Sequence, residues 1–253
     1  MSDSSVEDVS SFRSHLIELK QRLTIAVVVY LLGVVVLMNF SDAIYDFISL
    51  PLRQVLPEGS KMIFIGAPDV FFTYLKVALL VSLFATSPVT LYEIWAFIAP
   101  ALYRNEKKVF FGYMLSSIAL LLAGGAFAYF VVFPLAFKFF IGFANEHIQA
   151  LPAVKEYLSF ALKLLLAFGL SFQIPIVMMI LSRLDLMDPD SIAKKRRFVI
   201  LWIFVFGALL TPPDAISQVM LAVPMMALFE VGLVLARMGH KRAARVQAMQ
   251  DQE

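Results

Sequence analysis

Long apolar stretches alternate with short polar segments along most of the chain. A bilayer core of about 30 Å needs about 20 residues of helix to cross it, and most of these stretches approach or exceed that length. A backbone that contacts lipid must satisfy its own hydrogen bonds, so we expect every stretch to be helical. The pattern predicts an all-α, polytopic membrane protein with six transmembrane helices in a single domain, residues 1–253, which ends in a tail, residues 237–253. The predicted spans are residues 23–40, 71–99, 109–134, 157–182, 198–211 and 215–236.

Composition supports this class of protein. Hydrophobic residues make up 60% of the chain and charged residues 16%, with a mean hydropathy of +0.83, whereas soluble domains are about half apolar and about a quarter charged. The absence of cysteine excludes disulfides and thiolate metal sites. The net charge of +2 comes from segregated basic segments, so it does not indicate nucleic-acid binding. The short acidic N-terminus lacks the basic region of a removable signal peptide, so we expect the first span to be retained.

Lysine and arginine are unevenly distributed among the polar segments. Fifteen of the 21 lie before the first span, between the second and third spans, between the fourth and fifth, and after the sixth. The alternate segments hold four, and two further lysines, Lys76 and Lys163, lie near the outer ends of spans, where long side chains can reach the interface. Cytoplasmic segments carry the excess of basic residues in membrane proteins. Both termini are therefore predicted to be cytoplasmic.

Interruptions within the stretches predict irregular helices. Pro88, Pro175 and Pro224 each remove a backbone donor inside a span, which predicts kinks. The fifth stretch has only 13 residues at positions 198–210, about 20 Å of helix. Unless protein shields the fifth and sixth spans, the bilayer beside them is predicted to be thinned. Small residues four apart in the third stretch predict the close approach of another helix. These are Gly112 with Ser116, and Ala119 with Ala123.

Polar side chains inside the spans are the best indicators of function, because they are costly in lipid. Gln173 is ten residues from the nearest charged residue on either side and therefore lies deep in the membrane. Its amide either satisfies the backbone carbonyl that Pro175 leaves free or forms a polar docking point for a transmembrane helix of a partner. Gln218 is a second amide inside a span. Glu93 and Glu230 lie nearer to cytoplasmic ends, where we expect them to reach the interface.

Signs of enzymatic chemistry are weak. The three histidines lie outside the spans, and the sequence has no GxSxG motif, no paired histidines and no phosphate-binding glycine loop. We therefore expect no catalytic residues, no metal site and no cofactor.

Two carboxylates stand in the basic cytoplasmic flanks. Glu18 precedes the first span and has Arg22 four residues on, a favourable spacing for a helix ion pair. Glu106 precedes the third span, where it would interact favourably with the helix dipole. Orientation does not require acidic groups at these positions. Alternatively, two carboxylates on one membrane face suit a ligand with two adjacent arginines, whose guanidinium groups form bidentate pairs that lysine cannot reproduce.

Seven ordered segments between residues 10 and 237 carry a family resemblance. They are HLIELKQRL (15–23), SLPLR (49–53), WAFIAPALYRNEKK (95–108), AYFVVFPLAF (128–137), YLSFALKLLLAFGLSFQIP (157–175), KKRRFV (194–199) and LLTPPDAISQ (209–218). Together they resemble the signature segments of TatC, the six-span receptor subunit of the twin-arginine protein translocase.

The resemblance implies a curved, cupped helical bundle in the bacterial plasma membrane, without enzymatic activity. Such a subunit binds twin-arginine signal peptides at the cytoplasmic face. With single-span TatA-type and TatB-type partners it exports folded proteins by means of the proton-motive force, as a homo-oligomer within a TatBC-like receptor complex. The implied roles are signal-peptide binding by Glu18, Glu106, Leu23 and Phe97, docking of partner helices by Gln173, Thr211 and Gln218, and outer-side structural roles for Pro51 and Asp214.

Two positions depart from the family pattern. Lys20 stands where arginine is usual, which keeps the charge but loses the planar fork. Gln173 stands where glutamate is frequent, and an amide cannot titrate. The main alternative function is a small-solute secondary transporter, but the corresponding halves and ionisable midplane residues of such transporters are not evident. A membrane-embedded enzyme, the third possibility, would need a nucleophile with its base, or a metal site.

Overall fold

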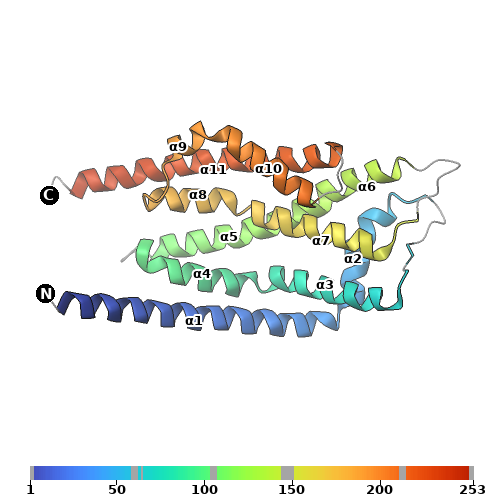
Figure 1. Cartoon of the computed structure of the whole chain (residues 1–253), viewed down its shortest axis with the longest axis horizontal. Coiled ribbons are helices and arrows are strands. Elements are labelled where there is room, and N and C mark those ends of the chain that lie inside the picture. Colours follow the sequence, from blue (N-terminus) through green and yellow to red (C-terminus); the bar gives the residue numbers. More distant parts are fainter. Residues whose placement is uncertain are drawn as a thin grey trace.

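The structure, a computed structural model, is helical along nearly all of the chain that it describes (Figure 1). The described residues are 3–57, 62–63, 65–102, 107–143, 151–210 and 215–250. Within these ranges the only β-structure is an isolated bridge between Ile63 and Ala153, so the prediction of an all-α membrane protein is confirmed. The helices are α1 (Asp3–Met38), α2 (Ser41–Arg53), α3 (Ala67–Ala85), α4 (Ser87–Leu102), α5 (Lys107–Phe127), the π-helix η1 (Ala128–Val132), α6 (Phe133–Ile141), α7 (Val154–Ser171), α8 (Ile174–Arg183), α9 (Pro189–Lys194), α10 (Arg196–Leu210) and α11 (Ala215–Gln250).

The long helices run side by side along the longest axis of the molecule (Figure 1). The first residues of α1 and the last residues of α11 lie at the same end, here called the inner end, and α2 lies toward the opposite, outer end (Figure 1). Termini at one end are what an even number of membrane crossings requires. That the inner end faces the cytoplasm stays a prediction.

Five segments of the described chain are long and apolar enough to cross a membrane. The span that is missing from these five is the predicted fifth span, residues 198–211, which corresponds to α10 with its 15 residues, or about 22 Å of helix. This length is less than the bilayer core of about 30 Å, so the six-span count and the thinning beside α10 stay predictions. The five segments are His15–Met38, Pro68–Ala85, Phe110–Ile141, Val154–Arg183 and Ala215–His240.

Two of the three prolines singled out in the sequence follow breaks between helices. Pro88 follows the break at Thr86 between α3 and α4, and Pro175 follows the break that includes Gln173 between α7 and α8. Pro224, in contrast, lies inside α11, which continues without a break. Because α11 packs against both α8 and α10, contacts on either side of the proline hold the helix together despite one missing hydrogen bond.

A further irregularity, the π-helix η1, was not predicted. It directly precedes α6, whose second residue is Pro134. A proline ring clashes with the carbonyl four residues before it in a regular α-helix, and the wider π turn makes room for the ring.

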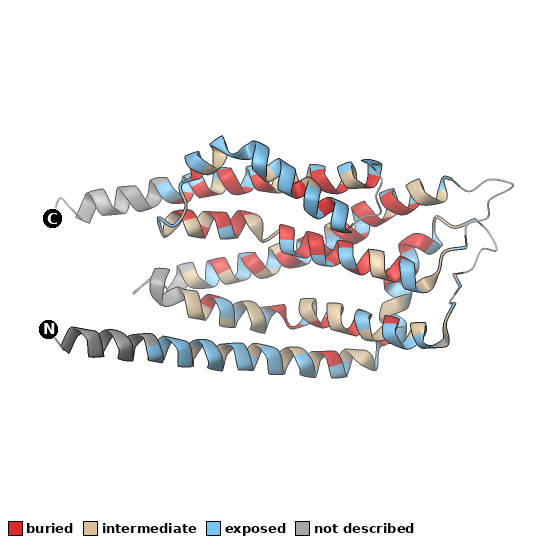
Figure 2. Cartoon of the chain, in the orientation of Figure 1, coloured by how far each residue is buried: buried red, intermediate tan, exposed pale blue. Residues whose placement is uncertain are grey.

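The core of the molecule lies along α7. Buried residues gather on α7 and on the neighbouring helices that face it (Figure 2). Phe168 of α7 and Phe133 of α6 are both fully buried. In α1, by contrast, only 6% of the residues in its most apolar part are buried. This helix contacts α3 and α4 along one side and presents the rest of its surface outward.

Close helix approach occurs on a different face of α5 from the predicted one. A Cβ atom on Gly124 would lie 2.5 Å from the carbonyl oxygen of Phe168, so α5 and α7 meet at this glycine. No helix of the described chain packs on the four small residues: all four are exposed, and a Cβ atom on Gly112 would meet nothing within 4 Å. The approach of a helix from another chain at these residues stays a prediction. Spacing by four identifies a stripe of small residues but not which stripe of the helix faces the neighbour.

Candidate functional site

A cluster of three charged side chains joins α1 to α4 near the inner end. Arg22 donates two hydrogen bonds to Oε1 of Glu18, from Nε at 2.9 Å and from Nη2 at 2.8 Å. Its remaining terminal nitrogen, Nη1, donates to Oε2 of Glu93 on α4 at 3.1 Å. The side chains of Glu18, Arg22 and Glu93 are 36%, 26% and 11% exposed. Glu18 is therefore the outermost member of the cluster and Glu93 the innermost.

Glu93 was expected to extend to the membrane interface, and this expectation was wrong. Its carboxylate turns into the contact between α1 and α4, because an arginine on α1 is within reach and a paired carboxylate tolerates burial. Arg22 and Glu93 are 71 residues apart in sequence, so spacing along one helix did not indicate the pair.

The other predicted signal-peptide positions surround this cluster only in part. The ring of Phe97, one turn from Glu93 on α4, stacks on His15 with 4.5 Å between the centroids. Leu23 follows Arg22 and is 60% exposed. Glu106 lies outside the described residues, in the segment between α4 and α5.

Gln173 lies at the break between α7 and α8 and is half-buried. Its Nε2 donates a hydrogen bond of 2.9 Å to the carbonyl oxygen of Ser117 on α5. The hydroxyl of Ser117 in turn accepts a 3.1 Å hydrogen bond from Nε1 of Trp95 on α4. The reading in which Gln173 satisfies the carbonyl left free by Pro175 was therefore wrong, since its partner is on another helix. Docking of a partner helix stays a prediction.

Gln218 also bonds within the chain. Its Nε2 donates a 2.9 Å hydrogen bond to the carbonyl oxygen of Phe204, which joins α11 to α10. Thr211 and Asp214 lie outside the described residues, between these two helices. Of Thr211 and Gln218, which were predicted to dock a partner helix together, the structure therefore describes only Gln218.

Pro51 lies inside α2 and is buried. Proline has no N–H group, so the carbonyl four residues earlier, that of Phe47, loses its helical partner. The hydroxyl of Tyr129 in η1 donates a 2.7 Å hydrogen bond to this carbonyl, and the hydroxyl of Tyr157 on α7 donates one of 2.7 Å to the carbonyl of Ile48. The two tyrosines thus fix α2 to the outer ends of η1 and α7.

Charged pairs also hold the outer end. Arg53 pairs with Asp46 on the same helix, α2. Hydrogen bonding to this carboxylate raises the pKa of the Arg53 guanidinium. Lys155 at the start of α7 pairs with Asp69 at the start of α3, with 3.0 Å between Nζ and Oδ1. Each pair is partly exposed and contributes up to about 1 kcal/mol.

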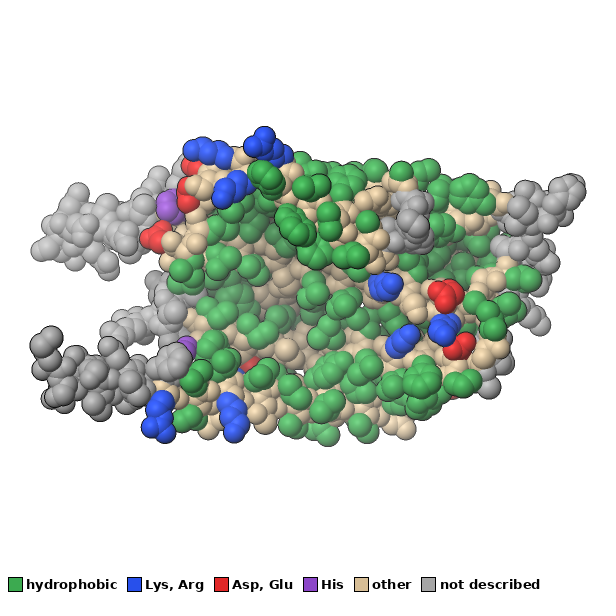
Figure 3. Space-filling view, in the orientation of Figure 1, with side chains coloured by type: hydrophobic (Ala, Val, Ile, Leu, Met, Phe, Trp, Pro, Cys, Tyr) green, Lys and Arg blue, Asp and Glu red, His purple; other side chains and the backbone are tan. Residues whose placement is uncertain are grey.

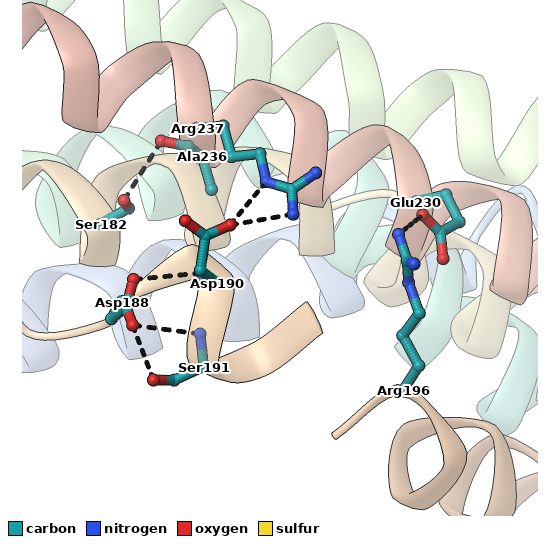
Figure 4. A network of polar contacts seen from close by, with 8 residues as sticks. All are labelled: Ser182, Asp188, Asp190, Ser191, Arg196, Glu230, Ala236 and Arg237. Carbon is teal, nitrogen blue, oxygen red and sulfur yellow. Dashed lines mark hydrogen bonds and ion pairs between the residues drawn. The ribbon is translucent and has the colours of Figure 1, made fainter. Parts of the chain in front are cut away.

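A polar network near the inner end connects the segment around α9 to α11 (Figure 4). Asp188 caps α9 by accepting bonds from the hydroxyl and N–H of Ser191 and from the N–H of Asp190, which lowers the pKa of its carboxyl. Asp190 pairs with Arg237 at 2.9 Å, and Glu230 pairs with Arg196 at 2.7 Å. The cap was readable from the sequence, because an aspartate followed by proline is typical of a helix start.

These features define a class of protein. It is a polytopic helical membrane protein whose polar side chains bond other side chains or backbone carbonyls where helices meet. The face shown in Figure 3 is hollowed near the middle. No group of three or more metal-ligating side chains occurs in the part of the chain that the structure describes.

The chain belongs to the TatC family: residues 14–224 match the family model of the Sec-independent protein translocase protein TatC. It is 44% identical to TatC of Escherichia coli strain K12 over 92% of this chain and 90% of that protein. It is 42% identical to TatC of Desulforapulum autotrophicum over 93% of this chain and 87% of that protein. A crystal structure of the twin-arginine translocase receptor TatC has a TM-score of 0.81 and 36% identity, covering 89% of this chain and 99% of the other. The chain is thus a translocase subunit of the inner membrane, and the alternative of a small-solute transporter is not supported.

Proposed function

We propose that the chain is the receptor subunit of a twin-arginine translocase, with both termini in the cytoplasm. In this role it binds twin-arginine signal peptides at the inner end and, with TatA-type and TatB-type partners, exports folded proteins by means of the proton-motive force. The proposal is supported by the twin-arginine receptor whose solved structure resembles this chain.

One contact carries the proposed binding mode. Glu18 already accepts two N–H bonds from a single guanidinium group, that of Arg22. An arginine of a signal peptide presents the same donors, and its planar fork distinguishes it from lysine. Glu106 would receive the second arginine, Leu23 would contact the apolar part of the signal peptide, and Phe97 would line the site beside His15.

Partner helices are proposed to dock at Gln173 and at Gln218 with Thr211. Each of the two glutamines donates one N–H to a backbone carbonyl, and an amide has a second N–H and a carbonyl oxygen with which to bond a partner. These contacts would assemble several copies of the chain with the single-span subunits.

The binding site is tested with the purified full-length chain in detergent and a fluorescent synthetic peptide that carries two adjacent arginines. Glu18→Gln and Glu106→Gln should each weaken binding about fivefold, which corresponds to about 1 kcal/mol per exposed ionic contact. Glu230→Gln is the matched control, because it removes the carboxylate of another partly exposed ion pair near the inner end. The double variant combines Glu18→Gln with Glu106→Gln. If it binds the peptide as tightly as the parent, Glu18 only pairs with Arg22 and does not bind the signal peptide.

A further inference from the structure

The cluster of Glu18, Arg22 and Glu93 contains two negative charges and one positive charge. One guanidinium group is shared between a carboxylate at the surface and a carboxylate that is mostly buried. We propose that Glu93 is a positioning residue, which retains Arg22 when the guanidinium group of a signal peptide takes over Glu18. This inference rests on the proposed function, because it concerns the same binding site.

The positions of the oxygens indicate how the exchange would proceed. Both bonds from Arg22 to Glu18 end on Oε1, which leaves Oε2 as the oxygen at which an arriving guanidinium group begins to bind. Glu18 is also the most exposed member of the cluster. A ligand that approaches from the aqueous side therefore meets Glu18 before it meets Glu93.

Arg22 pairs with Glu18 and also competes with the signal peptide for this carboxylate. Without a second carboxylate it would have to remain on Glu18, where it would occupy Oε1 and repel a second guanidinium group. Glu93 already bonds Nη1 at 3.1 Å, so rotation of the Arg22 side chain toward α4 keeps the guanidinium paired while Glu18 becomes available. The buried carboxylate thus lowers the cost of displacing Arg22.

A different reading of the same contact is that Arg22 and Glu93 merely hold α1 against α4. The two interpretations predict opposite effects of one substitution, Arg22→Gln, on peptide binding. If the pair is only a structural link, then Glu93→Gln and Arg22→Gln both weaken the packing and both lower peptide binding. If Glu93 restrains a competitor, Glu93→Gln weakens binding, whereas Arg22→Gln strengthens it.

The test is a double-mutant cycle with the fluorescent twin-arginine peptide and the full-length chain. Glu93→Gln should weaken binding about fivefold, Arg22→Gln should strengthen it by a similar factor, and the double variant should bind at least as tightly as the parent. Glu230→Gln again serves as the control, because it breaks the Arg196 pair without touching α1 or α4.

The outcomes separate this inference from the proposed function. Recovery of binding in the double variant cannot come from a protein that Glu93→Gln has unfolded, so recovery supports the inference. Unchanged binding by Glu93→Gln, or a double variant as weak as Glu93→Gln alone, overturns it even when Glu18→Gln weakens binding. If Glu18→Gln binds like the parent, the proposed site itself fails, and the role of Glu93 fails with it.

Discussion

Removing the hydroxyl of Tyr129 tests whether this tyrosine replaces the donor that Pro51 lacks. In Tyr129→Phe the ring still stacks on Phe47, with 4.5 Å between the centroids in the parent, but the carbonyl of Phe47 loses the bond of 2.7 Å. Leaving a partly buried carbonyl without a donor costs about 1–3 kcal/mol. Tyr157→Phe is the matched comparison. The carbonyl of Ile48 keeps the helical N–H donor four residues on, so this variant should lose only about 0.5–1.5 kcal/mol of unfolding free energy.

The assay is thermal unfolding of the purified chain in detergent. For a chain of this size each kcal/mol corresponds to about 2–4 °C in Tm, so Tyr129→Phe should unfold several degrees lower and Tyr157→Phe less. Pro51→Ala restores an N–H to α2 and should shrink the effect of Tyr129→Phe in the double variant. Equal losses for the two tyrosines, or a Tyr129→Phe loss that is independent of residue 51, would refute this account of Pro51.

Three further predictions concern topology, the intramembrane amide and pH. Reporter fusions after residues 55, 104, 147, 190 and 245 should report out, in, out, in and in, and an outward C-terminal fusion would exclude the six-span topology. Gln173→Leu should weaken association with partner helices by about 1 kcal/mol, the value of one intramembrane hydrogen bond, and cross-linking measures this loss. Unchanged cross-links and export would show that the amide serves only its bond with Ser117. Because the pKa of Asp188 is lowered in the folded chain, its cap stabilises α9 above the unfolded pKa of about 4 and is lost as the pH falls through the folded value. Protection of the α9 amides against hydrogen exchange should therefore fall below about pH 4 in the parent, whereas in Asp188→Ala it should be lower already at pH 7 and respond less to pH.

The sequence allowed the fold class to be predicted because lipid imposes one backbone solution, the helix, on each long apolar stretch. It also indicated the i, i+4 contact between Glu18 and Arg22, since neighbours on one helix follow from spacing. Contacts between helices were not readable in this way. The pairing of Arg22 with Glu93 and the bond from Gln173 to Ser117 depend on which faces meet, and periodicity does not specify the facing partner.

The order in which the chain is made bears on the bonds that hold α2. Tyr129 lies 82 residues after Phe47, and Tyr157 lies 109 residues after Ile48. During synthesis α2 therefore emerges long before either hydroxyl exists, and of the helices that follow it and pack on it only α3 is made early. The first outer segment can reach its final position only after the segment that contains η1 has been inserted, and it becomes fully fixed only with α7. Assembly of the outer end is thus a late event in membrane insertion, although α2 is the second helix to be synthesised.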